Sequence, residues 1–340
     1  MAHSTHPLKI FGVSGAITLL TLVVVWVFMG PQAALLAGIL CVIEITFSFD
    51  NAIINARVLK TLSPFWQQLF LTVGIIIAVF GMRLVFPIAI VAATTSLDWQ
   101  QVLNLALNDP EQYAHALEGA GPLITAFGGS FLLMLGLHFF FDWQRKSTWL
   151  AIEKPLLKMH SNWLPAVITL LALIGLVIIP EHPAPRAALI AGIAGIVTYL
   201  VVHGLSEAVS HNRSLTGVKH KVGLAAFWTF LYLEVLDASF SFDGVIGAFA
   251  ITSDVVIIAA GLGVGAFWVR SLTIYMVRKK VLDQYIFLEH GAHYTIVLLA
   301  IIMLMSVFFH LPEAVPGLLG ISVIGSSVYS SMRHRKRRLA

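Results

Sequence analysis

The sequence contains little charge and almost no cysteine. Only 11% of its 340 residues are Asp, Glu, Lys or Arg, whereas a soluble domain carries about 25%. The single cysteine, Cys41, excludes an intramolecular disulfide framework. A nucleotide-binding Gly-rich loop, an HExxH motif and a Gly-x-Ser-x-Gly motif are also absent from the sequence. We therefore expect neither an ATP-driven pump formed by this chain alone nor an enzyme.

Long hydrophobic runs dominate the sequence instead. Hydrophobic residues make up 58% of the chain, and the mean hydropathy is +0.89. We predict an all-α, polytopic bundle in a lipid bilayer, with about ten transmembrane helices in a single membrane domain, 1–340. The predicted spans are 10–29, 33–56, 67–93, 122–141, 163–180, 187–207, 223–251, 255–277, 292–310 and 314–331.

The basic residues predict the orientation of these spans. Cytoplasmic loops of membrane proteins are enriched in Lys and Arg. With the N-terminus inside, all 21 basic residues fall in cytoplasmic segments except Arg186, Arg83 and Arg270. We therefore expect a multi-pass protein of the inner or plasma membrane with both termini in the cytoplasm. The net charge of +4 is explained by topology, so we expect no nucleic-acid partner.

The tetrapeptide Phe-Ser-Phe-Asp occurs twice, at 47–50 and 240–243. Glu44 precedes the first copy and Asn51 follows it, whereas Asp237 and Gly244 occupy the matching positions around the second copy. The two copies lie on predicted spans that run in opposite directions. This arrangement predicts an inverted internal repeat, as in many secondary transporters. We place its two cores at 31–142 and 223–310.

Each copy is followed by an arginine on the next predicted span, Arg83 and Arg270, and we expect these arginines to pair with acids or to gate the site. On an ideal helix, the acids that precede each tetrapeptide lie on the same stripe of the helix surface as the Ser of that tetrapeptide. Asp50 and Asp243 fall about 120° from that stripe on an ideal helix. Either each Asp faces a neighbouring helix, or the helix is unwound at Ser-Phe-Asp. Glycine after the second copy permits unwinding there, and nothing comparable favours it in the first copy.

The polar residues around the two copies form an oxygen-rich set. Carboxylates inside a membrane are energetically expensive and are usually functional, and oxygen ligands suit Mg²⁺, Ca²⁺ and Mn²⁺. Five acids against two arginines leave an excess of negative charge, which predicts a bound divalent cation with protons as counter-ion. Alternatively, the acids only pair with the arginines and lock helices together. The predicted metal ligands are Glu44, Ser48, Asp50, Asn51, Glu234, Asp237, Ser241 and Asp243.

The segment from Glu44 to Asn51, together with the second Asp-x-Ser-Phe-Ser-Phe-Asp copy, resembles the TerC superfamily of integral membrane proteins. It is most similar to a branch with a domain of unknown function. The resemblance implies Mn²⁺ export, with an association with tellurite resistance in some members. The resemblance further implies that the residues matching the family motif belong to a metal site: Glu44, Asp50, Asn51, Asp237 and Asp243. Gly244 in place of a second Asn, and helices beyond the family core, depart from the family pattern.

Weaker signals lie at predicted helix ends. Glu289, His290 and His293 are placed to line a cytoplasmic vestibule. Two further pairs have i,i+4 spacing, His138 with Asp142 and His203 with Glu207, and such pairs bind metal, relay protons or simply meet water at the interface.

We expect a secondary transporter of a divalent cation, with manganese export as the first hypothesis and no resident cofactor. Two alternatives remain. One is a non-transporting membrane subunit of a metal- or tellurite-stress complex, and the other is a calcium/proton exchanger.

Overall fold

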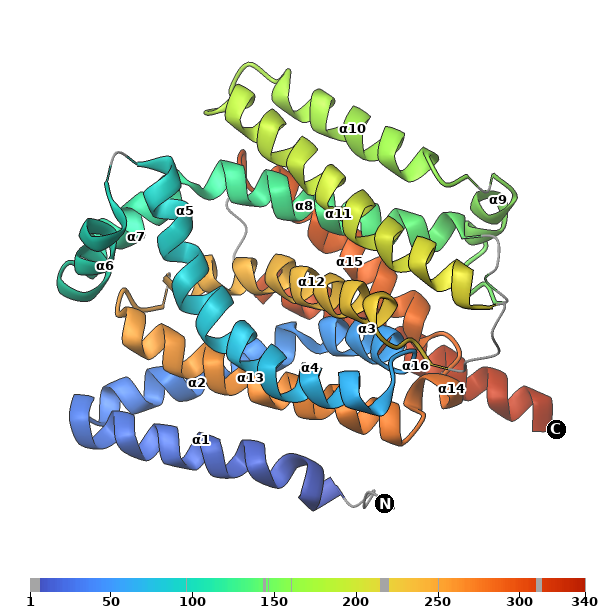
Figure 1. The fold of residues 1–340 in the computed structure, drawn as a ribbon, viewed down its shortest axis with the longest axis horizontal. Coiled ribbons are helices and arrows are strands. Elements are labelled where there is room, and N and C mark those ends of the chain that lie inside the picture. The colour runs from blue at the N-terminus through green and yellow to red at the C-terminus, as the bar shows by residue number, and fades with distance from the viewer. Residues whose placement is uncertain are drawn as a thin grey trace. The chain divides into compact units, whose positions relative to one another are not determined.

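The computed structural model describes residues 7–95, 97–142, 145, 147–159, 161–214, 220–249, 251–309 and 314–339. Within these ranges the chain forms sixteen α-helices and one π-helix, with no strand (Figure 1). The predicted all-α, polytopic fold is therefore confirmed.

Among the described residues, eight helices are long and apolar enough to cross a membrane. A ninth span results if α2 (Pro31–Phe47) and α3 (Phe49–Leu59) are counted as one bent pair, and the apolar α10 (Leu164–Val177) is shorter. Each of the ten predicted spans thus corresponds to one helix or to consecutive helical segments. The membrane character is shown, whereas the orientation, the identity of the membrane and the inverted repeat stay predictions.

The chain divides into two compact units, which we describe separately. Unit 1 comprises residues 1–52, 64–121 and 234–279, and unit 2 comprises residues 53–63, 122–233 and 280–340. Two helices contribute to both units, α3 and α12 (Leu224–Phe249). The other helices of unit 1 are α1 (Pro7–Met29), α2, α4 (Pro64–Ile76), η1 (Ile77–Val85), α5 (Phe86–Thr94), α6 (Trp99–Asn108), α7 (Pro110–Gly119) and α13 (Val255–Arg278).

Helix α13 packs tightly against α2 in unit 1 because small residues line the contact. A Cβ atom on Gly261 would lie 2.6 Å from Leu40 Cβ, and one on Gly265 would lie 2.5 Å from Glu44 Cβ. Helix α1 covers another side of α13, where Ser14 Oγ lies 2.7 Å from Ser271 Oγ. Glycine at 261 and 265 therefore lets two apolar helices approach closely, as is common in membrane bundles.

Helices α4, η1 and α5 form one long apolar span, Pro64–Thr94, with a π-helix in its middle. A π-helix disturbs the regular i→i−4 hydrogen-bond pattern and is frequent at functional sites. Here it contains Arg83, whose buried Nη1 donates to the carbonyl of Ala78 at 2.6 Å. The irregular segment thus gives a buried guanidinium one of its hydrogen-bond partners.

The first Phe-Ser-Phe-Asp copy lies at a break in the chain, whereas the second lies within a continuous helix. Helices α2 and α3 meet at Ser48 with a bend of 54°, but α12 is helical throughout 224–249. Glycine permitted unwinding after the second copy, but the helix is continuous there and is interrupted at the first copy instead. At the break, Ser48 Oγ donates to Glu44 Oε1 at 3.0 Å.

Unit 2 also contains α8 (Gly121–Phe141), α9 (Glu153–Lys158), α10, α11 (Pro185–Ser214), α14 (Val281–Gln284), α15 (Leu288–Met305) and α16 (Ala314–Leu339). Glycines again allow close contacts: a Cβ on Gly129 would lie 2.8 Å from Leu304 Cγ, and one on Gly291 would lie 2.5 Å from Ser327 Oγ. These contacts hold α15 against α8 and α16.

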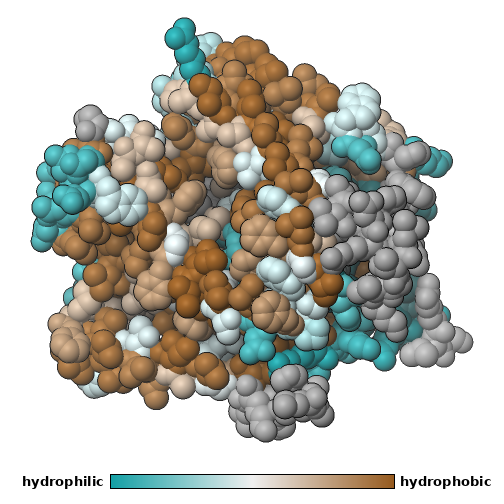
Figure 2. Space-filling view, viewed as in Figure 1, coloured by the Kyte–Doolittle hydropathy of each residue, from teal (hydrophilic) through white to brown (hydrophobic). Residues whose placement is uncertain are grey.

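Hydrophobic residues cover much of the visible surface, and hydrophilic residues gather over α6 and α7 (Figure 2). Many large apolar side chains are exposed, including Leu19, Val27 and Phe28 on α1. An apolar surface of this extent is unusual for a soluble monomer. It is expected where helices face lipid.

Candidate functional site

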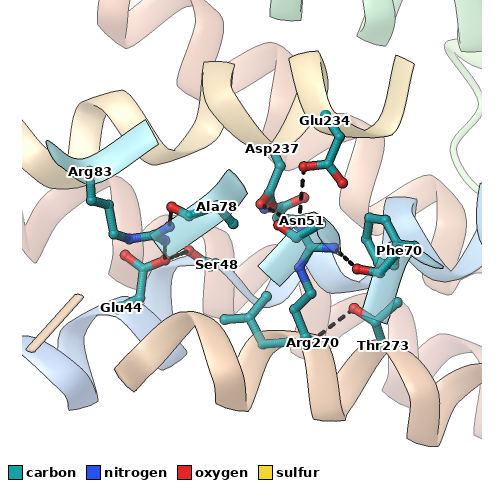
Figure 3. Close-up of polar contacts among 12 residues, drawn as sticks. Glu44, Ser48, Asn51, Phe70, Ala78, Arg83, Glu234, Asp237, Arg270 and Thr273 are labelled. Carbon is teal, nitrogen blue, oxygen red and sulfur yellow. Dashed lines mark hydrogen bonds and ion pairs between the residues drawn. The ribbon is translucent and has the colours of Figure 1, made fainter. Parts of the chain in front are cut away.

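Glu44 and Arg83 form a buried ion pair next to the first tetrapeptide. Arg83 Nη2 donates to Glu44 Oε1 at 2.5 Å, and the hydroxyl of Ser48 donates to the same oxygen (Figure 3). Gly244, which follows the second copy, lies beside this carboxylate, because a Cβ there would be 3.3 Å from Glu44 Oε2. The absence of a side chain at 244 therefore leaves room for Glu44.

Arg270 occupies the equivalent place next to the second tetrapeptide. Its Nη2 donates to Asp237 Oδ2 at 3.2 Å and lies 3.5 Å from Glu234 Oε2 (Figure 3). The same guanidinium donates to the carbonyls of Phe70 and Gly74 at 2.6 and 2.9 Å. Glycine is required at 74, since a Cβ there would lie 2.5 Å from Arg270 Nη1. The predicted pairing of both arginines with acids is thus present in the structure.

A hydrogen bond joins two residues that flank the first and the second copy. The Nδ2 of Asn51 donates to Asp237 Oδ1 at 2.7 Å, and both side chains are buried (Figure 3). Residues 186 positions apart in the sequence therefore belong to one polar cluster within unit 1. Sequence spacing alone placed Glu44 with Ser48 and Asn51, but could not show which residue of the other copy they would meet.

Asp50 differs from the other acids of the cluster. It is buried and lies in the first turn of α3, where its Oδ1 accepts a hydrogen bond from the Asn51 backbone N–H at 2.9 Å. None of the ion pairs between described residues involves Asp50. A helix N-terminus favours a negative charge, so the break at Ser48 creates a suitable position for this carboxylate. The side chain of Asp243 lies outside the described residues.

Several oxygens of the cluster are buried without a hydrogen-bond donor among the described groups. They are Asn51 Oδ1, Ser241 Oγ and both carboxylate oxygens of Glu234, of which Oε2 still forms an ion pair with Arg270 Nη2 at 3.5 Å. Buried polar atoms are nearly always satisfied by protein, water or an ion. These atoms are therefore the ones that could coordinate a cation.

The described side chains do not form a ready-made metal centre. No group of three or more His, Cys, Asp or Glu residues among them is close enough to hold a metal ion. Glu44 and Asp237 each hold a guanidinium instead. Binding of a cation by Glu44 or by Asp237 would therefore require the paired arginine to withdraw.

The three predicted vestibule residues lie in unit 2. Glu289 is 3.6 Å from Arg57 Nε and 3.8 Å from Lys60 Nζ. His293 is buried and stacks on Phe139, with 3.7 Å between the ring centroids. His290 is also buried. The vestibule stays a prediction, because these histidines are packed among other side chains.

His290 belongs to a buried charge cluster that the sequence did not reveal. Glu153 Oε2 accepts a hydrogen bond from Arg145 Nη1 at 2.7 Å and lies 2.9 Å from His290 Nδ1. Burial raises the pKa of Glu153. Interactions with His290, with the Leu150 backbone N–H and with Arg145 lower it by more than burial raises it, so that the net shift of the pKa is downward. Burial lowers the pKa of Arg145. The sequence around Glu153 does not predict this cluster, because Glu153 is a single acid in a basic loop.

Comparison with known families assigns the chain to a group without an assigned activity. The family model described as "Protein of unknown function (DUF475)" matches residues 49–338, which include Asp50, Asn51 and the whole second copy. No curated protein and no solved structure matches the chain. The resemblance to the TerC superfamily is not tested by these matches and stays a prediction. Because the family model covers most of its length, the chain belongs to the DUF475 family of membrane proteins.

Proposed function

We propose that this protein is a secondary transporter of a divalent metal cation, with Mn²⁺ as the first candidate and protons as the counter-ion. The cation binds at the polar cluster of unit 1, between the two Phe-Ser-Phe-Asp copies. Its ligands come from Asp50, Asn51, Glu234, Asp237 and Ser241. Glu44 and Asp243 are the remaining carboxylates of the proposed site.

The excess of buried acid over buried base carries this proposal. Among the described residues of unit 1, Glu44, Asp50, Glu234 and Asp237 are the buried acids, and Arg83 and Arg270 are the buried bases that oppose them. Four carboxylates and two guanidiniums leave a formal charge of −2 when all are ionised, which one divalent cation would neutralise. Pairing alone does not require the extra acids, and uncompensated charge inside a membrane costs several kcal/mol.

The chemistry of the oxygens in this cluster supports a hard cation. Carboxylate, amide and hydroxyl oxygens are the ligands of Mg²⁺, Ca²⁺ and Mn²⁺, whereas sulfur and imidazole favour softer ions. Mn²⁺ is preferred here because of the resemblance to TerC proteins.

The bent pair α2 and α3 supports a transport cycle. Secondary transporters often bind substrate where a membrane helix is interrupted, because the helix ends there carry partial charges. In the cation-free state, Arg83 and Arg270 would occupy Glu44 and Asp237. In the loaded state, the cation would take the place of at least one guanidinium. Protons that enter when the cation leaves would neutralise the acids without an arginine, above all Asp50.

Transport by purified protein in liposomes tests the proposal. We expect Mn²⁺ uptake that depends on a pH gradient in the parent protein. Asp50→Asn combined with Asp237→Asn should lower the initial rate at least tenfold, because two of the four described acids lose their charge. The matched control is Glu118→Gln, which removes an exposed acid on α7 and should transport at the parent rate.

Each outcome distinguishes the proposal from an alternative. Unchanged uptake in the double variant would reject the site, and uptake independent of the pH gradient would reject proton coupling. Absence of flux in the parent protein would favour the non-transporting subunit. Preferential uptake of Ca²⁺ over Mn²⁺ in a competition experiment would favour calcium exchange.

A further inference from the structure

A serine hydroxyl extends the buried charge cluster of unit 2. The Oγ of Ser147 lies 2.9 Å from His290 Nε2, and His290 Nδ1 lies 2.9 Å from Glu153 Oε2. The three side chains therefore form two consecutive hydrogen bonds in the order hydroxyl, imidazole, carboxylate. A triad of this order activates the serine of many hydrolases, and it is recognised by its geometry rather than by sequence position.

The Glu153 carboxylate is placed to orient the imidazole. It is buried, and its Oε2 accepts a hydrogen bond from Arg145 Nη1 at 2.7 Å. The backbone N–H groups of Trp149 and Leu150 also donate to this carboxylate, each at 3.2 Å. These donors favour the ionised carboxylate, which can only accept hydrogen bonds. The contact with Glu153 therefore assigns the proton of His290 to Nδ1.

The other nitrogen of His290 is then free to accept a proton. With the proton on Nδ1, Nε2 is an acceptor, and the hydroxyl of Ser147 donates to it. Two aromatic rings hold the imidazole in this orientation. Phe139 and Phe287 meet it in T-shaped contacts, with centroid distances of 5.3 and 6.0 Å. The nitrogen that would remove the serine proton thus already faces the hydroxyl, as an activated nucleophile requires.

The serine is the member of the triad that a substrate can reach. Ser147 is partly exposed, whereas His290 and Glu153 are buried. The neighbouring Arg145 has two buried donors, Nε and Nη2, without an acceptor among the described groups. Preorganised donors of this kind stabilise the negative charge that develops on the oxygen of a reacting carbonyl.

We propose that Ser147, His290 and Glu153 form a nucleophilic site that hydrolyses carboxylic esters, with Arg145 as the oxyanion donor. Ser147 Oγ bonds to the carbonyl carbon, and its proton passes to His290 Nε2. The bond from this carbon to the leaving oxygen breaks, and His290 gives the proton to that oxygen. Water then releases the acyl group by the same steps, so that ester and water give acid and alcohol.

This activity does not depend on the proposed transport. The competing explanation is that the hydrogen bonds only hold the segment 147–153 against α15. In that case the hydroxyl of Ser147 would react no faster than that of an ordinary serine.

Labelling with a fluorophosphonate–rhodamine probe separates the two explanations. The probe bonds to an activated serine through phosphorus and releases fluoride. We expect the purified full-length protein to become fluorescent, with mass spectrometry placing the adduct on Ser147, and the Ser147→Ala protein to stay unlabelled. Ser161→Ala is the matched control, because the Ser161 hydroxyl contacts only backbone N–H groups among the described residues. It should be labelled at the parent rate.

Hydrolysis of p-nitrophenyl acetate measures turnover at the same site. The parent should release nitrophenol at least tenfold faster than Ser147→Ala. Glu153→Gln keeps the size of the side chain but removes its charge, and should slow both labelling and hydrolysis at least tenfold at a temperature where it is folded. Asp50→Asn with Asp237→Asn should react as the parent does, whether or not it transports Mn²⁺.

A cysteine substitution tests the imidazole independently of the probe. Cys41→Ala removes the only native thiol, and a thiol beside a general base reacts faster because more of it is thiolate. In this background, iodoacetamide should modify Ser147→Cys at least tenfold faster than Ser161→Cys. Equal rates would overturn the proposal. So would a parent protein that the fluorophosphonate does not label, or labelling that is equal in the parent and in Ser147→Ala.

Discussion

Each buried arginine of unit 1 does more than neutralise one acid. Arg270 donates to two backbone carbonyls as well as to Asp237, and its guanidinium carbon lies 3.8 Å from the centroid of the Phe70 ring. Arg83 likewise bonds a carbonyl and Glu44. A lysine could not make these contacts together, because it lacks the planar fork of donors. The arginines therefore fix the positions of the acids while competing with any cation for them.

Removal of Arg270 should destabilise the protein strongly. We expect Arg270→Gln to lower the free energy of unfolding by about 3–5 kcal/mol, because it leaves buried acids without a partner. Denaturant unfolding in detergent would measure this change. Arg186→Gln, at an exposed arginine, is the control and should have little effect. An Arg270→Gln protein as stable as the parent would contradict the importance of the pair.

The Glu153 cluster should make stability depend on acid pH. The pKa of Glu153 is lower in the folded protein than its usual value of 4.5. The carboxylate therefore contributes stability that is fully present above pH 4.5 and is lost as the pH falls through the lower, folded pKa. We expect the thermal midpoint of the parent to fall more steeply below pH 4.5 than that of Glu153→Gln. Parallel pH profiles for the two proteins would contradict this assignment.

At the scale of helices, glycine positions decide which elements touch. Gly195 and Gly204 both lie within α11, but only Gly195 faces another backbone; nothing lies within 4 Å of a Cβ at Gly204. Composition cannot separate two such glycines, since both have the same helix propensity. The packing of α8 against α11 separates them.

This difference predicts opposite effects of one added methyl group. Gly195→Ala should destabilise by about 1–3 kcal/mol, because the methyl group meets the carbonyl of Phe127. Gly204→Ala should be neutral or should stabilise by up to about 1 kcal/mol, because alanine has the higher helix propensity. Unfolding midpoints of the two variants check the prediction. Equal effects would mean that α8 and α11 do not approach as described.

The break between α2 and α3 shows how far local rules extend. Glycines after the second tetrapeptide permitted an unwound α12, yet α12 is continuous and α2 ends before Ser48. The missing side chain at Gly244 leaves space beside the Glu44 carboxylate, and the helix is not unwound there. The helix that breaks is the one whose serine and glutamate bond each other next to a buried arginine.

At the scale of the whole molecule, the distribution of basic residues predicts a testable topology. The loop containing Glu181 should be outside, and the loop containing Lys154 should be inside. Cys41 is buried and is the only cysteine, so Cys41→Ala gives a background without thiols. A membrane-impermeant maleimide applied to intact cells should label Glu181→Cys.

The Lys154→Cys protein is the matched control for that experiment. Lys154 and Glu181 are both exposed, so that only their side of the membrane should differ. We expect labelling of Lys154→Cys after lysis alone. Labelling of Lys154→Cys but not Glu181→Cys in intact cells would invert the predicted orientation.

The sequence by itself determined the class of the protein and the principal acids. A hydrophobic run of about 20 residues identifies a membrane span independently of the other helices. An acidic residue that interrupts such a run can be recognised from the sequence alone. The positions of Arg83 and Arg270 on the next spans also predicted that they pair with the acids or gate the site, and the structure shows the ion pairs.

Only the tertiary structure decided which groups meet. It placed Asn51 on Asp237, broke the first motif helix at Ser48, buried Glu153 with Arg145 and brought His138 to His203. These contacts depend on the packing of helices that are distant in sequence. Local periodicity fixes the face on which a residue lies, but not the helix that this face will meet.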